Sequence, residues 1–162
     1  MSIESQLAKR LEFLQTVIDK EIALVDFAAQ QVFETPFTVE RAKLLDQEPM
    51  FALKLEAFTS RFCRLQDTLG DKLLPALLKA LGEPIEPFIT NLNKAEKFGW
   101  LESAESWIGL RQLRNQMIHE YIEDLELLAD AVQTAFEQLD SLKMFAQKMK
   151  MAEVSLSEAY QR

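Results

Sequence analysis

The chain has 162 residues, enough for one domain, and its 48% hydrophobic and 27% charged residues argue against a disordered or fibrous protein. Four glycines and five prolines are too few for the tight turns of a β-sandwich or barrel, and no apolar run approaches the roughly 18 residues of a membrane span. A net charge of −8 argues against binding of nucleic acid through the general surface, so neither DNA nor a membrane is an expected partner.

The first third of the chain predicts a long helix and a short one. Apolar residues recur at three-and-four spacing over Ile3–Phe33, which indicates an amphipathic helix that ends at Thr35-Pro36. A helix of about three turns at most follows from Thr38 and ends before Pro49. The apolar stripe of the long helix consists of Leu7, Leu11, Leu14, Val17, Ile18, Leu24 and Val25.

The middle of the chain carries a second long apolar pattern over Phe51–Leu81. Gly70 and Asp71 interrupt it, and a kink or break is expected there. Asp71 is a candidate cap for a new helix that holds Pro75 in its first turn, where the amides need no internal partner.

The remainder of the chain predicts a short helix and two longer ones. The short helix covers Phe88–Phe98 and stops at Gly99. The next begins at a Ser103 cap and runs towards Tyr121, and the last covers about residues 124–151. We therefore expect an all-α bundle of four long helices with additional short ones, in a single domain over residues 1–162.

Several kinds of chemistry are disfavoured by composition. One histidine and one cysteine cannot assemble a zinc site, and neither a Glu-x-x-His pair, a Gly-rich phosphate loop nor a Gly-Ser with paired aspartates occurs. No metal or cofactor is expected, and the chain is not expected to transfer nucleotides itself. Cys63 is interpreted as a packed core thiol, and with no second cysteine and no signal peptide the expected location is cytoplasmic.

The helix after Ser103 concentrates polar groups along one edge of its apolar arc. At about 100° per residue, Arg111, Asn115 and His119 follow one another beside the apolar arc, and Arg114 borders it. These residues alone leave two interpretations open. They form a site at the edge of a packing surface, or the histidine caps a carbonyl and the arginines pair with acids.

The segment Arg-Asn-Gln-Met-Ile-His-Glu-Tyr, which begins at Arg114, resembles the Arg-x4-His-x-Tyr signature of HEPN proteins, in particular the HepT-like toxin branch associated with nucleotidyltransferases. Trp107 and the Leu-Arg-Gln-Leu that follows it also resemble that branch. The resemblance implies an up-and-down helical bundle that forms homodimers, with two copies of the motif in one cleft. It further implies a metal-independent endoribonuclease.

The same resemblance implies a role for each motif residue. His119 is the expected general acid or base and Arg114 the cation that binds phosphate, with Asn115 and Arg111 in support. Tyr121 is the expected site at which a minimal nucleotidyltransferase antitoxin, encoded by a neighbouring gene, adds AMP and silences the nuclease.

In one continuous helix Arg114 and His119 point about 140° apart, so either a dimer cleft or an unwound helix end must bring them together. Two other functions stay open. The chain is alternatively a non-catalytic, substrate-binding subunit of a nucleotidyltransferase, or an unrelated helical interaction module.

Overall fold

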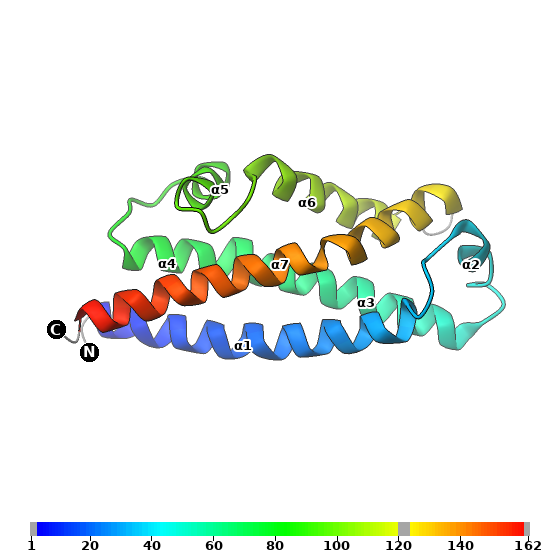
Figure 1. Ribbon diagram of the computed structural model, residues 1–162, viewed down its shortest axis with the longest axis horizontal. Helices are drawn as coiled ribbons and strands as arrows, with labels where there is room; N and C mark the ends of the chain where they lie inside the picture. The colour runs from blue at the N-terminus through cyan, green and yellow to red at the C-terminus, as the bar shows by residue number, and fades with distance from the viewer. Residues whose placement is uncertain (1–2, 120–123, 161–162) are drawn as a thin grey trace.

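The computed structural model describes residues 3–119 and 124–160, and all regular structure in these ranges is helical. Long segments run along one axis, with neighbours in the chain pointing in opposite directions and both ends of the chain at one end of the bundle (Figure 1). These segments are α1 (Ile3–Val32), α3 (Pro49–Asp67) with its continuation α4 (Leu74–Ala80), α6 (Ala104–His119) and α7 (Leu125–Tyr160). The expected all-α, up-and-down four-helix bundle is confirmed.

Two short helices connect the long segments. Helix α2 (Val39–Lys43) packs against α7, and its preceding loop is tied there by the Phe37 amide, which donates to Gln133 Oε1 at 2.8 Å. Helix α5 (Phe88–Lys97) crosses one end of the bundle between α4 and α6 (Figure 1). Within the described residues, no helix is both long enough and apolar enough to cross a membrane.

The helix ends follow local rules that the sequence displays. The Ser103 hydroxyl accepts from the Ser106 amide at 3.1 Å, so the expected serine cap of α6 is confirmed. Gly99, just beyond α5, has a φ of +81°, a left-handed conformation that favours glycine. Asp124 Oδ1 accepts from the Leu127 amide at 3.0 Å and starts α7.

A kink or break was expected in the second long segment, and the structure shows that the helical backbone is not broken there. The backbone continues from α3 through a π-helical turn, η1 (Thr68–Leu73), directly into α4, and Asp71 lies inside this turn rather than at a cap. The Leu74 amide donates to the Leu69 carbonyl, five residues earlier. Pro75 lies in the first turn of α4, as expected. Because proline lacks an N–H and crowds the carbonyl four residues before it, the wider π-helical turn before Pro75 lets the helical backbone continue.

Two further expectations need correction. The last helix continues to Tyr160, nine residues beyond the expected Met151, since neither glycine nor proline interrupts it. Leu24 is 46% exposed although it belongs to the predicted apolar stripe of α1, because the adjacent Val25 takes the buried position. One connected core otherwise includes side chains from every long segment; among the largest fully buried ones are Phe58, Phe62, Trp107 and Phe145.

Candidate functional site

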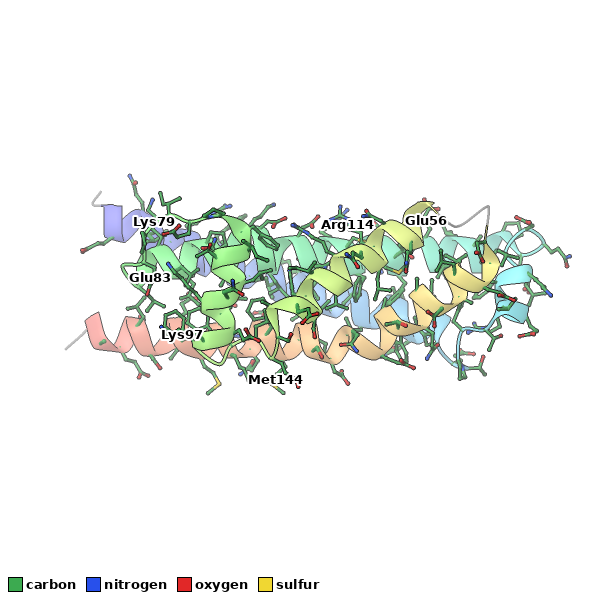
Figure 2. All side chains as sticks on the ribbon, turned by 90° about the horizontal axis from the view of Figure 1, so that it is seen from above. Glu56, Lys79, Glu83, Lys97, Arg114 and Met144 are labelled. Carbon is green, nitrogen blue, oxygen red and sulfur yellow. The ribbon has the colours of Figure 1, made fainter. Side chains whose placement is uncertain are left out.

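Helix α6 presents an apolar face to the core and a polar edge to α3. Its buried residues, among those whose side chains the structure describes, are Ala104, Trp107, Leu110 and Met117. Along the edge, Arg111 and Arg114 are partly buried and Asn115 is exposed. Figure 2 shows Arg114 on the side of α6 that lies over α3. The polar residues therefore border the packing surface, as the helical spacing predicted.

Both arginines of this edge are paired with aspartates from the neighbouring segment. Arg114 Nη1 lies 2.5 Å from Asp67 Oδ1, and Arg111 Nη2 lies 2.7 and 2.6 Å from Asp71 Oδ1 and Oδ2. The later arginine pairs with the earlier aspartate, which is the order expected for two antiparallel segments. These two pairs, which we call the ion-pair ladder, join α6 to α3 and η1.

Arg111 has a second contact that Arg114 lacks among the described residues. Its guanidinium carbon lies 4.2 Å from the centre of the Phe88 ring, a cation–π contact with the first residue of α5. Arg111 is therefore held by a carboxylate and by an aromatic ring from two different elements. Among the described residues, Arg114 is hydrogen-bonded to Asp67 only, which leaves more of its donors for a ligand than Arg111 has.

The indole of Trp107 packs closely against Gly70 of η1, beside the ladder. A Cβ on Gly70 would lie 2.9 Å from Cζ2 of Trp107, so only glycine lets the indole take this position without a shift. The indole also packs edge-on against Phe145 at 5.1 Å between ring centres. Within the described residues, Trp107 Nε1 and both amide atoms of Gln66 are buried without a hydrogen-bond partner.

Cys63 is a buried thiol close to the ladder. Burial raises the pKa of this thiol to about 11, and this effect outweighs the opposing influence of the nearby Arg114. A thiol with so high a pKa carries almost no thiolate at neutral pH. The interpretation of Cys63 as a packed core residue is confirmed, and the cysteine does not supply a nucleophile here.

Of the other motif residues, His119 is the last residue of α6. The backbone is helical through His119, so an unwound end before this residue is not observed. The His119 side chain and all of Tyr121 lie outside the described residues. The structure therefore locates Arg111, Arg114 and Asn115 together on one edge.

Sequence reasoning missed the two aspartates of the ladder. Asp67 and Asp71 are four residues apart, and Arg111 and Arg114 are three apart, so each pair shares one side of its helix. That complementary spacing was visible in the sequence. What the sequence did not show is that α3 and α6 are neighbours with these turns facing each other.

A separate hollow of about 650 Å³ lies at the end of the bundle that carries the chain ends, between α1, α4 and α7. Its lining combines apolar side chains with the carboxylates of Glu4, Glu12 and Glu153, and burial raises the pKa of Glu153. None of the lining residues belongs to the motif segment, so this hollow and the α6 edge are distinct.

Comparison of the chain with protein-family models, with curated proteins and with solved structures finds no match.

Proposed function

We propose that the chain is a HEPN-type, metal-independent endoribonuclease that acts as a toxin and is silenced by a nucleotidyltransferase partner. The observation that carries the proposal is the position of Arg114. Its guanidinium is oriented by Asp67 at the exposed edge of α6, with its side chain 32% exposed, five residues before the only histidine. A cation next to a proton-exchanging group is what metal-free cleavage of a phosphodiester requires.

In the proposed reaction, the 2′-oxygen of RNA attacks the adjacent phosphorus while a base takes its proton. The bond from phosphorus to the 5′-oxygen breaks, and an acid returns a proton to that oxygen, which leaves a 2′,3′-cyclic phosphate. His119 is the proposed acid or base, because an imidazole ordinarily titrates near pH 6.5. Arg114 stabilises the charge on the phosphorane, and the exposed Asn115 beside it orients the phosphate.

The continuous helix supports a site shared by two copies of the chain. The backbone is one unbroken helix from Arg114 to His119, and five residues of an ideal α-helix correspond to a rotation of about 140°. A symmetric dimer that places two copies of α6 together brings the Arg114 of one copy towards the His119 of the other. The proposed enzyme is therefore a homodimer.

Silencing is proposed to occur at Tyr121. Each AMP that a partner nucleotidyltransferase attaches to this hydroxyl adds negative charge and bulk within two residues of His119. RNA phosphates are then repelled from the cleft. Intact mass spectrometry after incubation with the partner and ATP should show AMP adducts on the wild-type chain and none on Tyr121→Phe.

A second candidate function is a non-catalytic, substrate-binding subunit of the nucleotidyltransferase. It is favoured by the ladder itself, in which an aspartate balances each arginine, and by the net charge of −8. Both features weaken the attraction of the site for RNA phosphate.

RNA cleavage by the purified chain in EDTA tests the proposal. We expect His119→Ala and Arg114→Ala to lose about 10²–10³ in rate. Arg10→Ala, which removes an exposed arginine on α1, serves as the matched control and should cleave like the wild type. Equal activity in all four proteins would remove the motif from the mechanism, and an inactive wild-type chain would favour the accessory subunit.

A further inference from the structure

From the ion-pair ladder we infer that Asp67 is a positioning residue, which orients Arg114 for the RNA phosphate. The inference rests on the proposed nuclease function and extends it to a residue on a different helix. In the described part of the chain, Nη1 is the only guanidinium nitrogen of Arg114 with a hydrogen-bonded partner, and that partner is Asp67 Oδ1. The orientation of the catalytic cation is thus set by α3.

The ion pair with Asp67 restrains Arg114 but uses only one of its hydrogen-bond donors. A guanidinium has five N–H donors in a planar fork, and one donor to Asp67 leaves the others for phosphate oxygens. The Arg114 side chain is 32% exposed, so part of it is accessible from solvent. Arg111 contrasts with it in its partners, because Arg111 faces both carboxylate oxygens of Asp71 and contacts the Phe88 ring.

Asp67 lies on a part of the backbone that is itself firmly placed. It is the last residue of α3, directly before the π-helical turn whose Gly70 packs against the buried Trp107 of α6. Because Trp107 and Arg114 belong to the same helix, the contact of Trp107 with Gly70 and the packing of α3 against α6 place Asp67 beside Arg114. The carboxylate is therefore presented to Arg114 by packed backbone.

The negative charge of Asp67 predicts an unusual kinetic signature. Beside Arg114 it repels RNA phosphate, so its removal should not weaken substrate binding. Its removal does free the guanidinium to rotate away from the transition-state position, where a misplacement of about 1 Å costs on the order of 10²-fold in rate. A residue with a merely structural role would lower kcat and raise KM together.

The test compares Asp67→Asn with a matched control, Asp26→Asn. Asp26 pairs with Lys143 between α1 and α7 at 3.0 Å, and both pairs have side chains about one-third exposed. We expect kcat of RNA cleavage to fall about 10- to 100-fold in Asp67→Asn, with KM unchanged or lower. Asp26→Asn should match the wild type, and Asp67→Glu should recover part of the lost kcat.

A second measurement reports the orientation of Arg114 without catalysis. In ¹⁵N-labelled protein, the Arg114 Nε–H signal is assigned by its loss in Arg114→Lys. Its heteronuclear NOE should drop in Asp67→Asn and stay unchanged in Asp26→Asn, since only the first variant removes the partner of Arg114.

The possible outcomes separate the inference from the proposed function. No cleavage by the wild-type chain contradicts the proposed function, and with it the catalytic part of the inference. Cleavage that Asp67→Asn and Asp26→Asn leave equal, or an unchanged Arg114 NOE, contradicts the inference alone. A higher kcat in Asp67→Asn, or a lower kcat together with a raised KM, also contradicts it.

Discussion

Helix α3 packs against α1 on one side and against α6 on the other, and the two contacts differ in kind. Both α1 and α3 contribute apolar side chains at most 1% exposed, among them Ile18, Val25, Phe58 and Leu65. The contact with α6 adds the two ion pairs of the ladder at its edge. Apolar burial supplies most of the folding free energy, whereas partly exposed ion pairs supply little but orient their groups. The apolar contact of α3 with α1 therefore provides most of the stability, and the ion pairs between α3, η1 and α6 orient charged groups.

The largest expected effect comes from the apolar contact. Phe58 is fully buried, and its ring packs edge-on against Phe33, 4.9 Å between ring centres. Phe58→Ala should lower the free energy of unfolding by about 3–5 kcal/mol, measured by urea denaturation, because it leaves a cavity. A loss below about 1 kcal/mol would mean that the α1–α3 contact does not dominate the stability.

A smaller effect is expected where α6 meets the π-helical turn. The Cβ of a Gly70→Ala variant would lie 2.9 Å from a buried ring atom of Trp107, so the indole or the backbone must move. We expect a loss of about 1–3 kcal/mol in the same denaturation assay. Gly109→Ala is the matched control, because Gly109 has no positive φ and its Cβ would meet no side chain or neighbouring element within 4 Å. Only the preference of helices for alanine over glycine should affect stability there. A neutral Gly70→Ala would contradict the close approach.

The ladder should contribute least to stability. Asp71→Asn removes the charged partner of Arg111 at a site where both side chains are more than one-third exposed. The expected loss is at most about 1 kcal/mol and should shrink as salt is added, because solvent and ions screen such pairs. A loss as large as that of Phe58→Ala would overturn the distinction between the two contacts.

Glu21 of α1 is an acid in the region where α1 packs against the end of α3. The pH dependence of stability that it causes is a further test of this contact. Burial raises the pKa of Glu21, although the Thr68 hydroxyl donates to its Oε1 at 2.9 Å. A raised pKa in the folded state means that folding binds protons, so stability falls as the pH rises from the ordinary value of 4.5 through the folded-state value. Glu21→Gln should therefore be more stable than the wild type at pH 7, and this advantage should vanish below about pH 4. An advantage that grows on acidification would contradict the raised pKa.

The helices were predictable because each one carries its own signals. The three-and-four spacing predicted buried positions such as Ile18, and the Ser103 cap and Gly99 stop marked ends that the structure confirms. Leu24 was wrongly predicted to be buried, because the apolar pattern of a single helix does not show how wide the buried face of that helix is.

The candidate site was only partly predictable. Arg114 and Asn115 could be placed on the edge of α6 from helical angles alone. The pairing of Arg114 with Asp67 could not, because it depends on which helices are neighbours and on their register. The π-helical turn was also missed, since Gly70 and Pro75 indicated a kink or break and nothing in the sequence indicated a wider helical turn.

The most direct test of the central claim mixes two inactive variants. If Arg114 of one copy acts with His119 of the other, a mixed dimer of Arg114→Ala and His119→Ala contains one intact site. After subunit exchange at equal concentrations, the mixture should cleave RNA in EDTA at about a quarter of the wild-type rate, because about half of the dimers are mixed. A mixture no more active than either variant alone would contradict the account.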